Sequence, residues 1–381
     1  MSAAGTPAGA RPWVVLAGGG TAGHVTPALA IAGALVEAGH DQRSVRFVGS
    51  RRGMERDLVP AAGFAVTLLP GRGIVRRLSR DNVGAALGLL AGTLEAVALV
   101  GRWRPAAVVS VGGYAAAPAA AAAVLWRVPL VLAEANAVPG AVNRLLGRFA
   151  VASAVSFPGT PLPRAVVTGN PIRERMRDVD RSAAGRRAAR AALGYPDDVH
   201  LVVIAGGSLG AGRLNEAALA LVDRWAARGD VALHHVVGAR NAEALARRAP
   251  ALPAGGVTYR QVSFEERMDL VYAAADVAVH RAGANTVAEL AAAGVPSVLV
   301  PLPGSPGDHQ GRNARAMAAA GAAVVVDDAA LDGERLAAEL DRLLGDPARL
   351  QRMAAGARTL AVPDAAARVA QLVEAHARER R

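Results

Sequence analysis

The chain has 381 residues with 52% apolar and 3% aromatic content, so it can bury a sizeable core and form roughly two to three domains. It has no cysteine, and all 43 of its basic residues are arginine, which excludes disulfides, thiol nucleophiles, Schiff-base lysines and lysine-based phosphate loops. The net charge of +11 suits an anionic partner such as nucleic acid, a phospholipid surface or a phosphorylated substrate. A compositional bias toward alanine and arginine would produce the same charge.

Short apolar runs rich in β-branched residues alternate with longer helical patterns along the chain. The runs that we predict to be strands span Val14–Ala17, Val45–Val48, Val108–Val111, Leu130–Ala133, Leu201–Ala205, Leu233–Val237, Val277–His280 and Val298–Val300. Continuous apolar strands separated by helices are typical of parallel sheets covered on both faces. A strand followed by a glycine pair occurs twice, at Gly18-Gly19 and at Gly206-Gly207. The predicted fold class is therefore α/β, with two doubly wound domains that face each other across a cleft.

We place the domain boundary at Gly169, just before a stretch that is rich in arginine and poor in apolar residues. The predicted domains are then residues 1–168 and 169–362. The segment 363–381 is again helical, and we expect it to pack back on the first domain. Because doubly wound sheets bind ligands at the carboxyl ends of their strands, we expect the ligands in a cleft between the domains.

Two segments bear on membrane association. The apolar run after Arg11 breaks at Gly18 and is too short for a secretory signal, so we predict none. Further along, an apolar helix predicted at Val83–Val100 follows four arginines, which are Arg72, Arg76, Arg77 and Arg80. A basic edge beside an apolar helix suits the surface of an anionic bilayer, and equally a core helix with a solvated flank.

The first glycine-rich turn runs from Gly18 to His24, between a strand and a helix that we expect to begin near Pro27. Glycines let backbone N–H groups approach a phosphate, and the start of a helix adds positive potential. His24 could take a proton from a substrate, or could merely cap the loop. A nicotinamide site needs an acidic residue at the end of the second strand, but residues 49–52 after Val48 have no carboxylate. This argues against a dehydrogenase.

The second half of the chain has a matching glycine turn at Gly206–Gly210, where backbone amides and the Ser208 hydroxyl offer a second anion site. Glu289 lies three residues after Thr286 and hence on the same helix face. There its carboxylate could accept both hydroxyls of a ribose, or could simply face solvent.

A loop rich in proline and glycine then leads to Asp308, a candidate N-cap for a helix whose start exposes His309 and Gln310. Neutral polar groups at this position can bind hydroxyls. Asp178 and Asp180 lie in a charged linker, and we interpret them as a solvated pair. No other spacing of carboxylates or histidines predicts a metal site.

In this order and spacing, the motifs resemble those of the MurG family, peripheral-membrane transferases that add N-acetylglucosamine to a lipid-linked precursor of the cell wall. The resemblance runs over nearly the whole chain, and it is carried by Gly19–Pro27, Gly112–Tyr114, Glu134–Asn136, Gly169–Arg173, Gly206–Gly210, Arg281–Glu289 and His309–Asn313. It implies two Rossmann-like domains in the GT-B arrangement, with a UDP-sugar bound mainly by the second.

The resemblance also implies roles for individual residues. Those implied to bind the donor are Arg173, Ser208, Phe264, Glu289, His309 and Gln310, with the ribose on Glu289 and the diphosphate near Ser208 and Arg173. Those implied to bind the acceptor pyrophosphate are Gly20, Thr21, Ala22, Gly23, Gly112, Gly113 and Tyr114. His24 and Asn136 would be the catalytic residues, close to the acceptor hydroxyl.

The implied reaction is an inverting transfer of N-acetylglucosamine from UDP-GlcNAc to undecaprenyl-pyrophosphoryl-N-acetylmuramoyl-pentapeptide (lipid I), giving lipid II. It implies no cofactor, no metal ion, no nucleic-acid partner, and a peripheral place on the cytoplasmic face of the cell membrane. The chain departs from the family's pattern at Ala133 and at Ala135 or Leu209, which leaves open a related transferase with another lipid-linked acceptor. The motifs are also compatible with a UDP-GlcNAc 2-epimerase and with a non-catalytic nucleotide-binding membrane protein.

Overall fold

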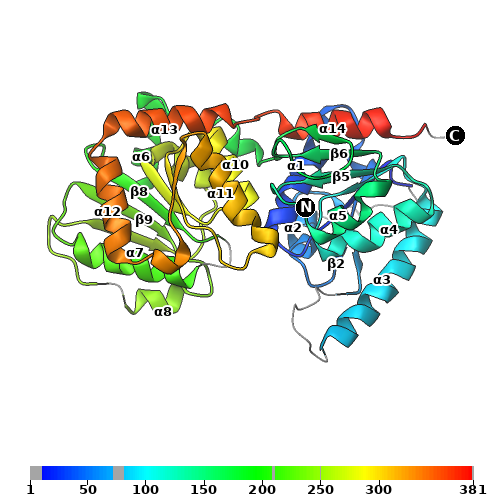
Figure 1. Ribbon diagram of the computed structural model, residues 1–381, viewed down its shortest axis with the longest axis horizontal. Helices are drawn as coiled ribbons and strands as arrows, with labels where there is room; N and C mark the ends of the chain where they lie inside the picture. Colours follow the sequence, from blue (N-terminus) through cyan, green and yellow to red (C-terminus); the bar gives the residue numbers. More distant parts are fainter. Residues whose placement is uncertain (1–10, 72–80, 208–210, 249, 380–381) are drawn as a thin grey trace, which may run out of the picture. The chain divides into compact units, whose positions relative to one another are not determined.

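The computed structural model describes residues 11–71, 81–207, 211–248 and 250–379 of the chain. These residues form two compact units, each built on one parallel sheet (Figure 1). The first unit comprises the chain up to Arg173 together with the segment from Val362 onward, and the second comprises Glu174–Ala361. Residues 169–172 belong to the first unit, where Gly169 lies so close to Val362 that a Cβ would come within 2.5 Å of that side chain.

The described part of the first unit has a seven-stranded parallel sheet in the order β3-β2-β1-β4-β5-β6-β7. The strands are β1 Val14–Ala17, β2 Val45–Ser50, β3 Ala65–Leu69, β4 Ala107–Ser110, β5 Leu130–Glu134, β6 Ala152–Val155 and β7 Ala165–Val167. In the register, Val14 of β1 pairs with Val45 of β2 on one side and with Ala107 of β4 on the other. The strand order reverses at this point, where doubly wound sheets bind their ligands.

Helices cover both faces of this sheet. They are α1 Ala22–Glu37, α2 Glu55–Ala61, α3 Asp81–Trp103, α4 Ala117–Leu125, α5 Ala141–Leu146 and α14 Ala365–His376. Val14 and Leu16 belong to one buried cluster and Val15 to another, because successive residues of a strand point to opposite faces. The C-terminal helix α14 packs against α1 and adds Val369 and Val373 to the first cluster.

Helix α3 is buried along only one side. Ala96 and Val100 lie in the core, but Leu87, Leu90 and Leu94 are 63%, 58% and 64% exposed. Among the described helices, α3 is the one that is long and apolar enough to cross a membrane, by length and composition alone. The four arginines predicted to flank it fall in residues 72–80, outside the described residues. The exposed leucines count against a core helix.

The described part of the second unit has a six-stranded parallel sheet in the order β10-β9-β8-β11-β12-β13. Its strands are β8 His200–Ala205, β9 Val231–Val236, β10 Thr258–Val262, β11 Val277–His280, β12 Ser297–Leu299 and β13 Ala323–Val325. Its helices are α6 Ala183–Leu193, α7 Gly212–Arg224, α8 Ala242–Ala246, α9 Met268–Ala274, α10 Ala284–Ala293, α11 His309–Ala319, α12 Gly333–Leu344 and α13 Pro347–Thr359. The order reverses at β8 and β11, which repeats the pattern of β1 and β4.

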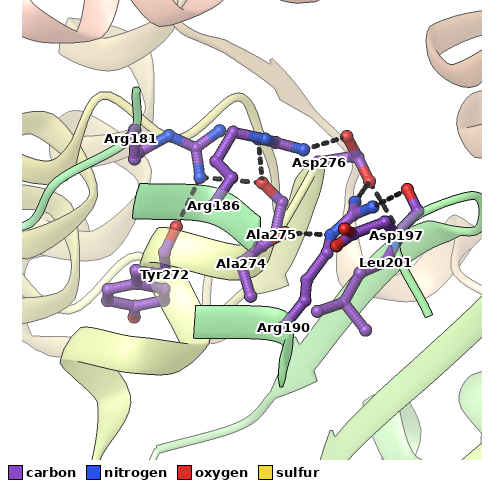
Figure 2. A network of polar contacts seen from close by, with 9 residues as sticks. All are labelled: Arg181, Arg186, Arg190, Asp197, Leu201, Tyr272, Ala274, Ala275 and Asp276. Carbon is purple, nitrogen blue, oxygen red and sulfur yellow. Dashed lines mark hydrogen bonds and ion pairs between the residues drawn. The ribbon is translucent and has the colours of Figure 1, made fainter. Parts of the chain in front are cut away.

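A network of arginines ties α6 to the amino ends of β8 and β11 (Figure 2). Asp276, just before β11, accepts hydrogen bonds from Arg186, from Arg190 at 2.7 Å and from the N–H of Leu201 at 2.7 Å. Arg181 donates to the carbonyl oxygens of Tyr272, in the last turn of α9, and of Ala275, just after it. Burial, together with the neighbouring arginines, lowers the pKa of Arg181 to about 9. The network fixes the first helix of the second unit on its sheet, at the edge opposite the carboxyl ends of the strands.

The predicted α/β fold class is confirmed, and the eight predicted strands are present with ends shifted by at most two residues. Sequence analysis did not predict β3, β6, β7, β10 and β13. Four of these, β3, β7, β10 and β13, are the outermost strands of their sheets, and their residues are mostly exposed or half-buried. The predicted start of the first helix near Pro27 was wrong, because α1 begins at Ala22. Pro27 is the sixth residue of α1, beyond the first four N–H groups that have no helical partner, so it removes one helical hydrogen bond, to the carbonyl oxygen of Gly23.

Candidate functional site

The first candidate site lies at the carboxyl ends of β1, β4 and β5. Gly19 and Gly20 after β1 have φ angles of 151° and 92°, while Gly112 and Gly113 after β4 have φ angles of 85° and 76°. Both turns therefore require glycine. The turns also touch, since a Cβ on Gly113 would lie 2.8 Å from the carbonyl oxygen of Gly19. The fold thus brings together the two loops that the sequence predicts to hold pyrophosphate.

His24, in the first turn of α1, lies against the glycine turn that follows β4. Its ring would come within 3.3 Å of a Cβ on Gly113 and within 3.5 Å of one on Gly112, so glycine leaves room for the imidazole. The Nδ1 of His24 is 3.3 Å from the Oγ1 of Thr21, a contact that orients the ring. Of the other residues predicted at this helix start, Gly23 is exposed and Ala22 is half-buried. The predicted catalytic histidine and the predicted phosphate turns therefore share one site.

Asn136 is held in place by Glu134, the last residue of β5. Glu134 is 6% exposed, and its Oε1 accepts hydrogen bonds from the backbone N–H and the side-chain amide of Asn136, at 3.1 and 3.2 Å. Its Oε2 accepts from the amide of Asn143 and from the N–H of Gly140, both at 3.0 Å. Asn143 also lies 3.4 Å from the Cβ position of Gly112, so the network reaches the β4 turn. Asn143 could not be predicted from the sequence, because the short helix α5 that contains it carries no motif.

The glycine turn after β1 holds a carboxylate of the chain itself. Glu55, in the first turn of α2, is 1% exposed. Its Oε2 accepts a hydrogen bond from the N–H of Gly20 at 2.8 Å, and its Oε1 accepts one from the N–H of Ser50 at 2.6 Å. The hydroxyl of Tyr114 donates to the Oγ of Ser50 at 3.1 Å. The N–H that the sequence predicts to meet a phosphate is thus already engaged, by a residue that sequence analysis did not single out.

The second candidate site lies at the carboxyl ends of β8 and β11. After β8, Gly207 has a φ of 89°, and the predicted donor residue Ser208 lies outside the described residues. After β11, Gly283 precedes α10, and Glu289 on that helix is 7% exposed. This burial rules out the freely solvated carboxylate that the sequence left open.

Two side chains of α11 hold the turn between β11 and α10. The Oε1 of Gln310 accepts hydrogen bonds from the N–H groups of Ala282 and Leu302, at 3.2 and 2.9 Å. Asn313, which is fully buried, donates from Nδ2 to the carbonyl oxygen of Ala282 at 3.1 Å. Because the carbonyl oxygen of Gln310 is used within the protein, the group that it can present to a ligand is its NH₂. Asn313 entered the sequence analysis only as the end of a motif.

Ion pairs to one carboxylate join the starts of α7 and α10. Asp328, just after β13, lies 2.6 Å from the Nη1 of Arg281 and 3.3 Å from the Nε of Arg213, in the first turn of α7. Arg281 is 9% exposed and donates to the carbonyl oxygen of Val300 at 3.1 Å. A single carboxylate therefore links the helices that follow both glycine turns of the second unit. No sequence motif marks Asp328, which begins a short 3-10 helix after β13.

The remaining predicted donor residues lie on loops and helix starts. Phe264 is 60% exposed between β10 and α9, and the Nδ1 of His309 is 2.9 Å from a backbone carbonyl oxygen. Asp308 stands at the N-cap position of α11 but does not cap it, because its carboxylate pairs with Arg315 at 2.8 Å. Arg173 is the last residue of the first unit before the chain enters the second.

The described residues contain no group of three or more histidine, aspartate or glutamate side chains suited to hold a metal ion. Asp180, which the sequence placed in a solvated pair, accepts a hydrogen bond from the N–H of Ser182 at 2.8 Å. That bond lowers the pKa of its carboxyl group. Its role is local, at the start of α6.

Two family models match the chain. The glycosyltransferase family 28 N-terminal domain matches residues 14–155, and the glycosyltransferase family 28 C-terminal domain matches residues 201–369. The chain belongs to glycosyltransferase family 28. The N-terminal match contains the turns around His24 and Gly112, and the C-terminal match contains Glu289 and Gln310.

Relatives of this family-28 chain are similar over nearly their full length. A protein of Nocardioides sp. is 42% identical over 94% of this chain and 97% of its own length. A protein of Alkalilimnicola ehrlichii is 43% identical over 96% of this chain and 99% of its own length. Both are named UDP-N-acetylglucosamine–N-acetylmuramyl-(pentapeptide) pyrophosphoryl-undecaprenol N-acetylglucosamine transferase.

Solved glycosyltransferase structures share the fold. MurG of Acinetobacter baumannii superimposes with a TM-score of 0.73 at 30% identity, covering 95% of this chain and 99% of that one. The glycotransferase of kitacinnamycin gives a TM-score of 0.71 at 18% identity, over 97% of this chain and the whole of the other. The second likeness shows the fold alone. Together they confirm the predicted glycosyltransferase architecture of two doubly wound domains.

Proposed function

We propose that this family-28 glycosyltransferase transfers N-acetylglucosamine from UDP-GlcNAc to lipid I with inversion, giving lipid II. The observation that carries the proposal is identity of 42% over 94% of the chain to a transferase with that name. The geometry of each unit supports it. A polar site lies at the carboxyl ends of both sheets, with His24 against glycine turns in the first and Glu289 buried on α10 in the second.

In the proposal, the second unit binds the donor. The carboxylate of Glu289 accepts hydrogen bonds from the two hydroxyls of the ribose. The diphosphate meets the amides at the starts of α7 and α10, because helix starts favour negative charge. Ser208 and Arg173 are the further diphosphate-binding residues that the resemblance implies. The NH₂ of Gln310, with His309, binds hydroxyls of the sugar, and the exposed ring of Phe264 covers the uracil.

The first unit binds the acceptor, and His24 acts as the general base. It removes the proton from the sugar hydroxyl of lipid I as this oxygen attacks the anomeric carbon and the bond to UDP breaks. The contact between His24 and Thr21 supports this role, since a base must be oriented as well as close. Asn136, fixed by Glu134, orients the attacking hydroxyl, and helix-start amides stabilise the charge on the leaving diphosphate.

We also propose that the protein works as a peripheral protein on the cytoplasmic face of the membrane, with α3 against the lipid. Leu87, Leu90 and Leu94 are spaced by three and four residues, so they share one helix face, and all three are exposed. An exposed apolar stripe of this kind is typical of an interaction surface. A net charge of +11 adds attraction to anionic lipid.

A related acceptor is the second candidate. At the end of β5 the buried side chain of Ala133 offers only a methyl group, where the resembled family usually has a histidine. A panel of lipid-linked acceptors with different sugars separates the two candidates by their kcat/KM values. A 2-epimerase is separated by incubation without acceptor, where only an epimerase releases the 2-epimer.

Glu289 provides the test of the donor site. We expect Glu289→Ala to weaken equilibrium binding of radiolabelled UDP-GlcNAc, measured without added metal, by about 10- to 100-fold, since hydrogen bonds to a charged group contribute roughly 1.5–3 kcal/mol. The control is Glu243→Ala, which removes an exposed glutamate of α8 and should leave binding unchanged. Unchanged binding in Glu289→Ala, or tight NADPH binding without affinity for UDP, would refute the proposal.

A further inference from the structure

Glu55 is a buried carboxylate for which the proposed mechanism has no use. It is 1% exposed, and no ion pair to it is found among the described residues. Its two oxygens accept hydrogen bonds from the N–H of Gly20, after β1, and from the N–H of Ser50, at the end of β2. Burying a carboxyl group is costly unless its oxygens are hydrogen-bonded, and these two N–H groups provide such bonds.

Three glycines make room for this side chain. A Cβ on Gly19, Gly49 or Gly53 would lie 2.2, 2.3 or 2.0 Å from the nearest atom of Glu55. Each such substitution would collide with the carboxylate or its methylene, so the local sequence leaves a cavity that Glu55 fills. The residues around it belong to the β1–α1 turn and to the segment between β2 and α2.

From Glu55, contacts lead to both predicted acceptor turns. Gly20 precedes the first turn of α1, which carries His24, and Ser50 accepts a hydrogen bond from the hydroxyl of Tyr114 at 3.1 Å. A Cβ on Gly20 would also lie 3.0 Å from the ring of Tyr114. One carboxylate therefore connects the turn before His24 with the turn that ends at Tyr114.

We propose that Glu55 is a positioning residue for the acceptor side of the transferase. It acts as an internal anion that shapes the β1–α1 turn, holding His24 and Tyr114 in the arrangement that the acceptor needs. Since the N–H of Gly20 is bound to Glu55, a phosphate of the acceptor is held by other groups of these turns. This inference rests on the proposed function for its kinetic consequence, but not for the contact itself.

The test compares Glu55→Gln with Asp57→Asn in the full-length protein. Both residues are acidic and lie in the first turn of α2, but Asp57 is 80% exposed and its ion pair is to the neighbouring Arg56. In Glu55→Gln, the amide oxygen can accept a hydrogen bond from one of the two backbone N–H groups. The NH₂ is itself a donor, so the other N–H loses its partner. We expect faster hydrogen exchange of the amides in residues 18–25 and 48–54 of Glu55→Gln, and no change in Asp57→Asn.

The kinetic arm uses UDP-GlcNAc with a short-chain lipid I analogue. We expect kcat/KM for the acceptor to fall about 100-fold in Glu55→Gln, as expected when reacting groups are misplaced by about 1 Å. Binding of UDP-GlcNAc should stay at the wild-type value. A merely structural role would instead weaken donor binding and acceptor turnover together.

Two further results overturn the inference. One is unchanged exchange in residues 18–25, which would mean that Glu55 does not hold the turn. The other is faster exchange with an unchanged acceptor kcat/KM, which would mean that the turn does not position the acceptor. Absence of transfer by the wild-type protein would refute the proposed function and the kinetic role with it, while the exchange arm would still decide whether Glu55 holds the turn.

Discussion

At the residue scale, two buried histidines make the second unit sensitive to acid. The Nδ1 of His235 lies 2.9 Å from the hydroxyl of Tyr259, and the Nε2 of His280 lies 3.3 Å from that of Tyr272. Burial lowers the pKa of each histidine to about 4 in the folded protein. Both are therefore neutral in the folded state at any pH well above that value.

We predict that the free energy of unfolding falls as the pH drops from 6.5 toward 4. The pKa of each histidine is lower in the folded protein than its unfolded value of about 6.5, so unfolding takes up protons. Each histidine therefore lowers the free energy of unfolding by roughly 3 kcal/mol between pH 6.5 and pH 4. Denaturant unfolding of wild type and His280→Gln at pH 7 and at pH 4.5 checks this. The variant should be less stable at pH 7 but should lose less stability at pH 4.5. An equal loss in both proteins would contradict the prediction.

Some residues of the candidate sites could be predicted from the sequence and others could not. Motif and spacing singled out His24 and Glu289, and the fold gives both of them buried or packed surroundings. Glu55 and Asp328 carry no such signal, because a carboxylate in a helix turn or loop is ordinarily solvated. Their importance depends on which backbone amides and arginines the fold brings to them, and this is set by the pairing of strands far apart in sequence.

At the element scale, α3 is the helix whose apolar face has no cover within the described residues of its unit. We predict that a triple variant, with serine in place of each of Leu87, Leu90 and Leu94, sediments with anionic phospholipid vesicles at least about tenfold less than the wild type. The reason is that burying one leucine side chain contributes roughly 2 kcal/mol to binding. Donor binding by the second unit should remain at the wild-type value.

The control for α3 is Leu302→Ser, which removes an exposed leucine from a loop of the second unit. It should leave vesicle binding unchanged. If the triple variant binds vesicles as well as the wild type does, lipid does not contact this face of α3. Loss of binding in the control as well would point to a general change in the protein rather than to α3.

Elements differ in how well the sequence predicts them. The central strands β1, β4, β8 and β11 are short apolar runs that are buried on both faces, so composition alone identifies them. The outer strand β7 has only three residues and is exposed along its length, so it is too short to predict from its composition. Since the candidate sites lie at the carboxyl ends of the central strands, the sequence was most informative about the elements that carry these sites.

At the scale of the whole molecule, two units whose sheets share one strand order, apart from the additional β7 of the first, account for the repeated glycine turns. Each unit has one reversal of strand order and a set of polar side chains beside it. In the proposal, the first unit binds the lipid-linked acceptor and the second unit binds the sugar nucleotide. In the proposal the first unit selects the acceptor, and near the end of β5 the buried Ala133 has only a methyl group.

The most direct test of the account is turnover of the purified protein with UDP-GlcNAc and a short-chain lipid I analogue, with the product identified by mass and its new linkage by NMR. We predict a product larger by one N-acetylglucosamine, joined by a β-linkage, with one UDP released per transfer. Release of the 2-epimer from UDP-GlcNAc without acceptor, or an α-linked product, would contradict the account.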